Sequence, residues 1–493
     1  MKKRSAYLAI DFGTSNVHAS VIDAETTRII VNTNKKYGWY YPAQNQVELH
    51  IDETWKASEW AVGEVIRQLP EDVELLAITF SYFGDSITPV DEKGEALYGM
   101  IPGFCGRSFK EVQTISREIG ADTYAKITGN TLSTLATPSK IMWLRDNEPE
   151  VFKKAAGFYS NQQYVMRKLG LGDVQDRTMA ARKLMIDVKA NCWSAPILEL
   201  AGVTEQQLGT QIVESATVVG TIDHYGSVRL PRTLPVTIGC HDVSASLLSA
   251  GVRLENPDTI GVLMGTYEQM GYFSDTFVDG CNDFGDSLIF SCCYSSPFNN
   301  KYTVMDAFPT AGALLEWFCK NILRDPSADI GKLIADAKLD GTGSLMMLPY
   351  VENFHGAVVG MSLSTTTDEI FAAILESLAY QFVACVDYIR STREQPFTKL
   401  HFGGGGSRTD KLLQLRADLI QAPLGRMQNI ELPSLGACML AGLGNNWYAS
   451  VEDAAAHMGN PVSYFEPIPE NETKYAERYA KYKAISADYL RHY

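Results

Sequence analysis

The chain begins with three short runs of strand-forming residues that are separated by polar turns. They read YLAIDFGTSN, VHASVID and RIIVNT, and together they predict a meander of strands. A helical pattern follows from about Trp55 to Arg67, and the apolar run LLAITF predicts a further strand. The next segment, VDEKGEALYG, is rich in turn-forming residues. The first hundred residues therefore predict strands that alternate with a helix.

Hydrophobic spacing changes along the rest of the chain. Residues 109 to 200 are mostly helical in pattern, and the strand signal returns near Val236. From residue 258 to 273 the sequence repeats the order seen at the N-terminus, with an apolar strand, a Gly-Thr turn and a second apolar strand. Two such units, each offering backbone amides, predict two α/β domains that face one polyphosphate across a cleft.

The C-terminal part contains longer elements. The stretch DEIFAAILESLAYQFVACVDYIR predicts a long amphipathic helix, and KLHFGGGGSRTDKLLQLRADLI predicts a strand, a glycine turn and a helix. The tail from Pro467 to Tyr493 predicts a final helix packed on the surface. With 493 residues, the chain is longer than a single compact domain usually is, so two domains are expected.

Charge and composition narrow the function classes. The net charge is −15, and no Lys/Arg-rich run occurs beyond the initial MKKR, which argues against nucleic acid or an anionic membrane as a partner. The apolar run after MKKR stops at Asp11, and no window approaches the ~18 uninterrupted apolar residues of a membrane span. Nine cysteines lack a metal-binding spacing such as CxxC. These features predict a cytoplasmic protein with reduced thiols.

The first stretch that could carry chemistry is DFGTSN, residues 11 to 16. Gly13 permits a tight turn, and Thr14, Ser15 and Asn16 offer hydroxyl and amide donors. Asp11 stands at the end of the strand, where a carboxylate could hold Mg²⁺ through water. The alternative is a plain hairpin turn with a capping aspartate.

Two further glycine turns follow the same logic. In GTYE, residues 265 to 268, Gly265 and Thr266 could form a matching phosphate turn, or again a plain hairpin. In FGGGGSRTD, residues 402 to 410, four glycines between a strand and a helix bring the backbone close to a ligand at the helix N-terminus. This stretch is not a P-loop, and it lacks the acidic residue of a dinucleotide-binding fold.

The stretch GCHDVSAS, residues 239 to 246, places a carboxylate between a buried strand and a helix. Asp242 could accept a proton from a substrate hydroxyl during phosphoryl transfer, or it could only cap the helix. His241 beside it is a lesser candidate, because a histidine next to a catalytic carboxylate more often orients or packs than transfers protons.

Two longer stretches resemble the signatures of the FGGY family of carbohydrate kinases, and the resemblance extends over essentially the whole chain. ATPSKIMWLRDNEPEVF, residues 136 to 152, is similar to the N-terminal signature through Lys140, Trp143 and Asn147. GAVVGMSLSTTTDEIFAAILE, residues 356 to 376, is similar to the C-terminal signature. Its matching positions are Gly356, Val358, Gly360, Met361, Glu369, Ile370, Ala373 and Glu376.

The resemblance implies an actin-like α/β fold of two ribonuclease-H-like ATPase domains that close over ATP and a sugar. On this basis residues 1–247 form the N-terminal domain, with the sugar site, the first phosphate motif and the catalytic aspartate at its end. Residues 248–493 form the C-terminal, nucleotide-binding domain. By position, Asp242 is implied as the base that deprotonates the sugar hydroxyl.

The resemblance also assigns the nucleotide motifs. Asp11, Thr14, Ser15 and Asn16 correspond to the first phosphate and Mg²⁺ motif, and Gly265 and Thr266 to the second. The glycine turn corresponds to the adenosine motif, and ELPSLGA to a later stretch on the nucleotide side. Their implied contacts are Gly404, Gly405, Gly406, Gly436 and Ala437.

Within the family, the phrases TFSYFGDSITPVDEKGEALYG, GCHDVSAS, GTYE and GGGSR resemble the fuculokinase and rhamnulokinase branch. Asp85 and Arg107 are suited to bind vicinal hydroxyls by bidentate hydrogen bonds, although they could instead pair with one another at the surface. The implied sugar pocket contains Phe83, Gly84, Asp85, Arg107, His241 and Asp242.

Three departures from the family pattern stand out. His18 occupies a position where many members have a basic Arg or Lys, and the loop after LPYVEN is short and lacks a GERxP run. PGFCGRS replaces a tryptophan-acid-arginine element and leaves Arg107 without an acidic residue beside it.

The combined prediction is an ATP- and Mg²⁺-dependent kinase for a ketose, first a deoxyketohexose such as L-fuculose or L-rhamnulose. A pentulose such as xylulose or ribulose, or a polyol such as erythritol, is the alternative substrate. A protein of another class, an actin-like nucleotide-binding sensor or assembly protein, would keep the glycine turns but has no need of Asp242. The expected partner is a small-molecule sugar, and the expected assembly is a homodimer, with neither nucleic acid nor membrane as a partner.

Overall fold

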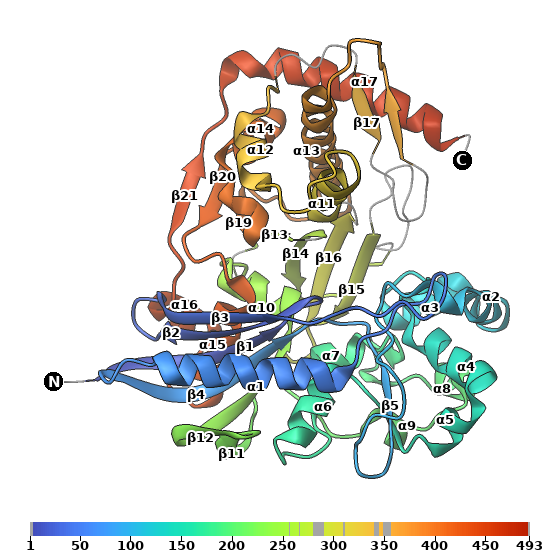
Figure 1. Ribbon diagram of the computed structural model, residues 1–493, viewed down its shortest axis with the longest axis vertical. Helices are drawn as coiled ribbons and strands as arrows, with labels where there is room; N and C mark the ends of the chain where they lie inside the picture. The colour runs from blue at the N-terminus through green and yellow to red at the C-terminus, as the bar shows by residue number, and fades with distance from the viewer. Residues whose placement is uncertain are drawn as a thin grey trace.

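Two β-sheets, one above the other in Figure 1, form the framework of the protein. The computed structural model describes residues 3–255, 257–265, 267–279, 290–308, 311–339, 345–348 and 356–491. Helix α10 (Asp242–Ser249) connects the last strand of the first sheet to the second half of the chain. The domain boundary expected after residue 247 falls inside this helix and stays a prediction.

The first sheet has six strands in the order β11-β12-β4-β1-β2-β3. Strands β1 to β3 form the antiparallel meander expected from the sequence, while β4 pairs with β1 and β12 pairs with β4 in parallel. Helix α1 (Ile51–Gln68) packs beside β2 and β3. The strands are β1 (Arg4–Phe12), β2 (Asn16–Asp23), β3 (Ile29–Lys36), β4 (Val73–Tyr82), β11 (Val218–Tyr225) and β12 (Val228–His241).

The second sheet repeats this topology. Its seven strands have the order β15-β16-β14-β13-β19-β20-β21, with β13, β14 and β16 antiparallel in succession and β19 and β20 parallel to β13. The repetition predicted from the two strand-turn-strand stretches is therefore confirmed. The strands are β13 (Thr259–Met264), β14 (Glu268–Ser274), β15 (Phe290–Ser295), β16 (Tyr302–Phe308), β19 (Lys399–Gly403), β20 (Leu424–Met427) and β21 (Val462–Phe465).

A mainly helical segment lies between β4 and β11, as the pattern of residues 109 to 200 predicts, and occupies the right side of Figure 1. Its helices are α2 (Phe109–Glu118), α3 (Ala121–Thr128), α4 (Thr137–Asn147), α5 (Pro149–Lys154), α6 (Asn161–Lys168), α7 (Arg177–Ala181), α8 (Ala195–Ala201) and α9 (Glu205–Leu208). Its short strands are β5 (Thr88–Val90), β6 (Gly157–Tyr159), β7 (Gln175–Asp176), β8 (Ile186–Asp187), β9 (Cys192–Trp193) and β10 (Ile212–Val213).

The helices of the second half include the long helix α13, which begins at a capping box in which Thr366 and Glu369 exchange hydrogen bonds. The others include the expected final helix α17. The elements are α11 (Gly312–Asn321), α12 (Ile330–Asp336), α13 (Thr367–Thr392), α14 (Asp410–Ile420), α15 (Leu432–Gly444), α16 (Val451–His457) and α17 (Glu472–Leu490), with the hairpin strands β17 (Met346–Leu348) and β18 (Ala357–Val359). Of the helices in the described part of the chain, α13 has the length and apolar composition of a membrane span, and 83% of its apolar window is buried inside the protein.

Helix α15 packs against α10 and against the first sheet, so it ties the two halves together. The Thr79 hydroxyl of β4 donates a hydrogen bond of 3.2 Å to the Ala437 carbonyl of α15. Gly436 is buried at the crossing of the two helices, where a Cβ atom would lie 1.8 Å from the Ala245 carbonyl oxygen of α10. Close helix packing accounts for this glycine without a nucleotide, and the predicted nucleotide contact of Gly436 stays untested.

The crossing of α10 and α15 predicts a strong effect of Gly436→Ala on stability. The added methyl group meets backbone atoms that cannot move aside, so we expect a loss of about 3 kcal/mol or more. Gly63→Ala in α1 is the matched control, because its Cβ would find only an ordinary contact at 3.4 Å with Val228. That change should stabilise the protein by about 0.5–1 kcal/mol through helix propensity. Thermal unfolding of both variants measures the contrast, and similar melting temperatures would contradict the packing argument.

Candidate active site

Three segments that are far apart in the sequence meet at one edge of the first sheet. Strands β1, β4 and β12 are parallel, and their register places Phe12 and His241 opposite Tyr82. The carboxyl ends of the three strands therefore lie side by side, which is where ligands bind in open α/β sheets. Asp11, the turn at residues 83–85 and Asp242 are brought together in this way.

The DFGTSN stretch forms a hairpin turn, closed by a hydrogen bond of 3.0 Å from the Gly13 amide to the Asn16 carbonyl. Ser15 is exposed, and the side chains of Thr14 and Asn16 are half-exposed. The Tyr37 hydroxyl donates to the Gly13 carbonyl and fixes the turn from outside. The hairpin is thus confirmed, and its exposed donors leave the predicted phosphate contact available.

Asp11 lies just before this turn. The Ser81 hydroxyl of β4 donates a hydrogen bond of 2.5 Å to Asp11 Oδ1, and His18 lies directly opposite Asp11 on β2. Burial raises the pKa of Asp11, whereas His18 and Ser81 act to lower it and Glu431 to raise it. His18, which replaces the basic residue common in the family, therefore still favours the ionised carboxylate.

Asp242 is the first residue of α10, and His241 occupies the N-cap position. The interpretation of Asp242 as the N-cap residue is therefore wrong in detail. Its Oδ1 atom accepts a hydrogen bond of 2.7 Å from the Val243 amide and lies 3.2 Å from His241 Nε2. Its Oδ2 atom has no partner in the described part of the chain. One oxygen is held by the helix start, and the other is free to receive a proton.

The electrostatic surroundings of Asp242 favour its protonated form. Burial is the main cause, and the nearby carboxylate of Asp11 adds to it, so that the pKa of Asp242 is raised to about 8. The Val243 amide and the Arg182 guanidinium act in the opposite direction, and Asp85 adds a smaller upward effect. The carboxyl group thus titrates in the range where a general base works best.

Asp85 is held in an unusual geometry beside Asp242. Its backbone adopts the left-handed conformation, with φ of 57°, and its carbonyl accepts a hydrogen bond of 3.0 Å from Lys140 Nζ. Asp85 Oδ2 forms an ion pair with Arg182 Nη2. Asp85 Oδ1 is buried and has no hydrogen-bond partner among the described residues. A buried acceptor without a partner costs free energy, so this atom is suited to a ligand.

Arg182, which lies directly after α7, is the partner that sequence reasoning missed. Its side chain is 3% exposed, its Nη1 donates to Asn130 Oδ1 at 2.9 Å, and its guanidinium lies 5.0 Å from the Tyr294 ring centre. Its Nε atom is buried without a partner. The only signal in the sequence is the pair of adjacent cations in MAARKLMI, which is otherwise apolar.

Gly84 allows the backbone to approach these groups closely. A Cβ atom at this position would lie 3.0 Å from His241 Nε2 and 3.1 Å from Arg182 Nε. Any side chain here would fill the space in front of both nitrogens. The predicted site residues Gly84, Asp85, His241 and Asp242 are therefore brought together, with Arg182 added.

Arg107 does not belong to this group in the expected way. It is buried and forms an ion pair of 2.9 Å with Glu48, while its Nε donates to Cys105 Sγ and its Nη2 to the Val47 carbonyl. The expectation that it lacks an acidic partner is wrong, because Glu48 comes from a distant part of the sequence. A surface pairing of Arg107 with Asp85 is also wrong.

Phe83 likewise lies apart from the polar groups of the site. Its ring is buried in the hydrophobic core of the first sheet, and its amide donates a hydrogen bond of 2.9 Å to the Phe12 carbonyl. The residue contributes packing at the strand end, and its predicted contact with a sugar stays untested.

The two glycine turns of the second sheet also meet. A Cβ atom on Gly404, which has a φ of 84°, would lie 2.7 Å from the Met264 carbonyl, and one on Gly406 would lie 2.9 Å from Met264 Cβ. Gly405 faces open space, and Gly265 is exposed. The predicted phosphate and adenosine turns are therefore neighbours. Thr266 and the loop after LPYVEN lie outside the described residues.

A buried ion pair joins these turns from behind. Glu268, the last residue of GTYE, forms two hydrogen bonds of 2.6 and 2.7 Å with Arg416 of α14, and both side chains are 1% exposed. The pair fixes the start of β14 against the helix that follows the glycine turn. A buried pair of this kind adds specificity of arrangement more reliably than stability.

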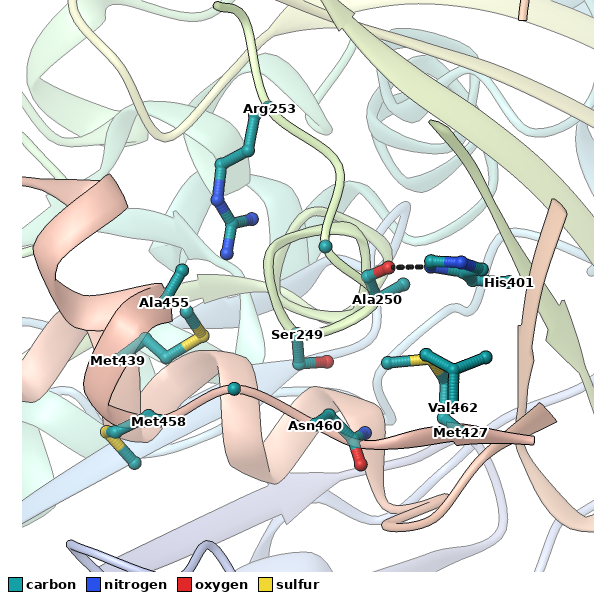
Figure 2. Close-up of a pocket in the computed structure, with 12 residues that line it drawn as sticks. Ser249, Ala250, Arg253, His401, Met427, Met439, Ala455, Met458, Asn460 and Val462 are labelled. Atoms are coloured by element: carbon teal, nitrogen blue, oxygen red, sulfur yellow. Dashed lines mark hydrogen bonds between the residues drawn. The ribbon is translucent and has the colours of Figure 1, made fainter. Parts of the chain in front are cut away.

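The far end of α10 is also anchored, next to a cavity of about 260 Å³ (Figure 2). His401 Nδ1 donates to the Ala250 carbonyl at 2.7 Å, and Arg253 Nη1 donates to the Leu248 carbonyl at 2.7 Å. Cationic or donor side chains at a helix C-terminus satisfy its last carbonyls. None of the predicted site residues lines this cavity.

No group of three His, Cys, Asp or Glu residues that could hold a metal by itself occurs in the part of the chain that the structure describes. A Mg²⁺ ion bound through one carboxylate, water and nucleotide phosphates does not require such a group. Asp11 is suited to serve in that way, because it is half-buried and its Oδ2 atom has no partner among the described residues. The residues present therefore fit Mg²⁺ as a companion of the nucleotide.

The raised pKa of Asp242 predicts that Asp242→Asn stabilises the protein in a pH-dependent way. The folded state retains the proton up to about pH 8, whereas an unfolded aspartate loses it near its ordinary pKa of 3.8. Wild-type stability therefore falls as the pH rises between these values, and the asparagine variant escapes this loss. The difference in melting temperature should grow from pH 5 to pH 8.5. The exposed Asp122→Asn serves as control, and a difference that is constant with pH would contradict the assignment.

Comparison with known proteins identifies the family of the chain. Residues 6–249 match the N-terminal domain of the FGGY family of carbohydrate kinases, and residues 286–444 match the C-terminal domain of the same family. The two matches together cover well over half of the chain.

Curated relatives with different substrates are about equally similar. The chain is 24% identical to a glycerol kinase of Desulforamulus reducens, with 92% of each chain covered. It is 24% identical to a xylulose kinase of Lactococcus lactis, with 97% of this chain and 96% of the relative covered. It is also 24% identical to an L-fuculokinase of Escherichia coli, with 95% and 99% covered. The resemblance to the fuculokinase branch is therefore not distinguished from the others.

Solved structures share the fold over the whole chain. A gluconate kinase from Lactobacillus acidophilus superposes with a TM-score of 0.84 at 18% identity and covers 100% of both chains. A Plasmodium falciparum glycerol kinase with ADP superposes with a TM-score of 0.82 at 20% identity and covers 98% of both chains. The expected actin-like, ribonuclease-H-like fold is thus confirmed, and the chain belongs to the FGGY family of carbohydrate kinases, ATP-dependent phosphotransferases with an alcohol group as acceptor.

Proposed function

We propose that this kinase transfers the γ-phosphoryl group of Mg²⁺-ATP to a hydroxyl group of a deoxyketohexose such as L-fuculose or L-rhamnulose. Asp242 is the general base, and Asp85 and Arg182 hold neighbouring hydroxyls of the sugar. Asp85 keeps the role predicted from the sequence, and Arg182 takes the role predicted for Arg107.

The observation that carries this proposal is a group of unpartnered polar atoms around Gly84. Asp85 Oδ1 and Arg182 Nε are both buried without partners, and Asp242 Oδ2 has none in the described part of the chain. The space next to Gly84 separates Arg182 Nε from His241 Nε2. An acceptor and a donor side by side match the two hydroxyls of a vicinal diol, with the third atom facing the reacting hydroxyl.

In the proposed reaction, Asp242 Oδ2 accepts the proton of the sugar hydroxyl while that oxygen forms a bond to the γ-phosphorus. The bond between this phosphorus and the β-γ bridging oxygen breaks, and ADP leaves. Positioning of the reactants and neutralisation of charge supply most of the catalysis, and the base adds about 10²- to 10⁴-fold. Asp11 would hold Mg²⁺, which neutralises phosphate charge when bound.

The nucleotide is proposed to lie between the two sets of turns. The exposed donors of Thr14, Ser15 and Asn16 would contact the phosphates from the first sheet, and Gly265 and Thr266 from the second. Gly405 offers open space for the adenosine beside Gly404 and Gly406. In this proposed arrangement the γ-phosphate would lie near the edge where Asp11 and Asp242 meet.

Apolar residues in and around the PGFCGRS stretch, which packs against Asp85 through Gly103, support a deoxy sugar as the substrate. Gly103, in the altered PGFCGRS stretch, packs so closely that a Cβ would lie 2.9 Å from Leu135 Cδ2 and 3.0 Å from Asp85 Cβ. Next to it Phe104 is 38% exposed and packs edge-on against Trp39, with 4.7 Å between the ring centres. A methyl group in place of a hydroxymethyl group would be favoured here by about 1–3 kcal/mol.

The family resemblance and the composition support the remaining predictions, which concern localisation, assembly and partners. We propose that the protein acts in the cytoplasm as a homodimer and has neither nucleic acid nor a membrane as a partner. Light scattering of the purified protein tests the assembly.

The experiment that tests the function is a substrate panel. ADP release is measured with L-fuculose, L-rhamnulose, D-xylulose, D-ribulose, glycerol and erythritol, and product mass shows which acceptor gains a phosphate. We expect the highest kcat/KM for one of the two deoxyketohexoses, and less than a tenth of wild-type turnover for Asp242→Asn. A pentulose or polyol as the best acceptor would replace the proposed substrate, whereas an active Asp242→Asn variant would remove the base assignment.

Replacement of Arg182 by lysine tests the proposed diol contact. Lysine keeps the positive charge but cannot bind Asp85 and present an Nε donor together, so we expect the KM for the sugar to rise about tenfold or more. The KM for ATP should stay within twofold of the wild-type value. Arg177→Lys on the adjoining helix α7 is the matched control, because Arg177 pairs with Glu214 outside the site. An unchanged sugar KM in Arg182→Lys would show that the guanidinium serves only the fold.

A further inference from the structure

A chain of close polar contacts leads from the second sheet to the proposed base. The Tyr294 hydroxyl of β15 lies 2.9 Å from His241 Nδ1, and His241 Nε2 lies 3.2 Å from Asp242 Oδ1. Further back, Ser244 Oγ lies 3.4 Å from the Tyr294 hydroxyl and 3.1 Å from Thr303 Oγ1. All of these side chains except Asp242 are buried, so the bonds are shielded from competing water.

The direction of these bonds follows from the chemistry of the groups. Burial raises the pKa of the Tyr294 hydroxyl and lowers that of His241, so the tyrosine keeps its proton and the imidazole is neutral. A neutral imidazole has one donor and one acceptor nitrogen. An ionised Asp242 carboxylate can only accept, so the ring nitrogen that faces it, Nε2, is the favoured site of the ring proton. Nδ1 is then the acceptor, and the Tyr294 hydroxyl donates to it.

We propose that Tyr294, acting through His241, is a positioning residue for the Asp242 base. The inference rests on the proposed role of Asp242. By donating to Nδ1, Tyr294 stabilises the tautomer of His241 in which Nε2–H faces Asp242 Oδ1 at 3.2 Å. Together with the hydrogen bond of 2.7 Å from the Val243 amide, this positive dipole orients Oδ1 and leaves Oδ2 as the atom that accepts the substrate proton. His241 therefore orients the base instead of binding the sugar.

The residues of this chain of contacts come from both halves of the protein. Asp242 and His241 follow the last strand of the first sheet, whereas Tyr294 and Thr303 belong to β15 and β16 of the second sheet. The same strand β15 contacts the first half through the Cys293 amide, which donates a hydrogen bond of 2.8 Å to the Gly129 carbonyl. The orientation of the base is thus supported by both halves of the protein.

Other side chains complete the surroundings of Asp242. Asp11 of β1, Asp85 after β4 and Arg182 after α7 act electrostatically on its carboxyl group, besides His241. Arg182 also lies over the Tyr294 ring, at 5.0 Å from the ring centre. A change from tyrosine to phenylalanine keeps this ring and removes only the hydroxyl group. Tyr294→Phe is therefore a selective test of the donor.

The test compares Tyr294→Phe with wild type on the best acceptor of the substrate panel, at saturating ATP, from pH 6 to pH 9.5. We expect kcat to fall about tenfold or more, with the KM for sugar and for ATP within twofold of wild type. His241 becomes free to adopt the other tautomer, which withdraws a donor from the ionised carboxylate. The rising limb of the pH profile of kcat/KM should therefore move to higher pH.

Two further variants, Tyr225→Phe and Asp242→Asn, distinguish a positioning role of Tyr294 from a structural role and from sugar binding. Tyr225→Phe is the matched control, because this buried tyrosine also donates one hydrogen bond of 2.9 Å, to Ser58 in the first sheet's core, and lies outside the site. It should lose a similar amount of stability and leave kcat and the pH profile unchanged. A Tyr294→Phe profile that coincides with the Tyr225→Phe profile would overturn the positioning role. A higher sugar KM at unchanged kcat would overturn it in favour of sugar binding.

Asp242→Asn, measured in parallel, distinguishes failure of this inference from failure of the proposed function. If Asp242→Asn is inactive while Tyr294→Phe resembles wild type, Asp242 is the base and Tyr294 does not position it. If Asp242→Asn retains turnover, the base assignment itself fails, and the inference fails with it.

Discussion

Parallel pairing of β1, β4 and β12 concentrates negative charge at one edge of the first sheet, and the site is arranged around that charge. Asp11, Asp85 and Asp242 stand at the ends of these strands, and Arg182 is ion-paired with Asp85. Burial is the main cause that raises the pKa values of Asp11 and Asp242, with Glu431 adding to the effect on Asp11 and Asp11 adding to the effect on Asp242. This edge of the sheet is therefore suited to a bound cation.

The two sheets share one topology but place different chemistry at equivalent strand ends. The first sheet ends its parallel strands in carboxylates, which can hold metal and accept protons. The second ends them at Gly265 and at the glycines 404–406, whose backbones approach within contact distance of Met264. Its ionised groups at this point, Glu268 and Arg416, are turned into the core and neutralise each other. The repeated fold thus has carboxylates at one set of strand ends and glycine turns at the other.

The local sequence pattern predicts the fold and the turns, because strand meanders, glycine turns and capping residues are encoded by neighbours in the sequence. It does not predict the side-chain partners that packing brings together from distant positions. The PGFCGRS stretch contains Arg107 but no acidic residue, and in the structure Arg107 forms its ion pair with Glu48, which is distant in the sequence. Arg182 sits in MAARKL with no recognisable motif, and only the tertiary structure sets its guanidinium against Asp85. Gly436 matched a nucleotide stretch, although a helix crossing explains it.

Helix α10 shows how both halves of the chain hold Asp242, the proposed base. Asp242 begins the helix directly after β12, yet α10 packs mainly against α15 and also contacts β13 and β14. At its far end, Arg253 and His401 hold its last carbonyls. With Tyr294 linked to His241, both ends of the helix are fixed by the second half of the chain. Asp242 is therefore held both by β12, which pairs with β4 of the first sheet, and by contacts from the second half of the chain.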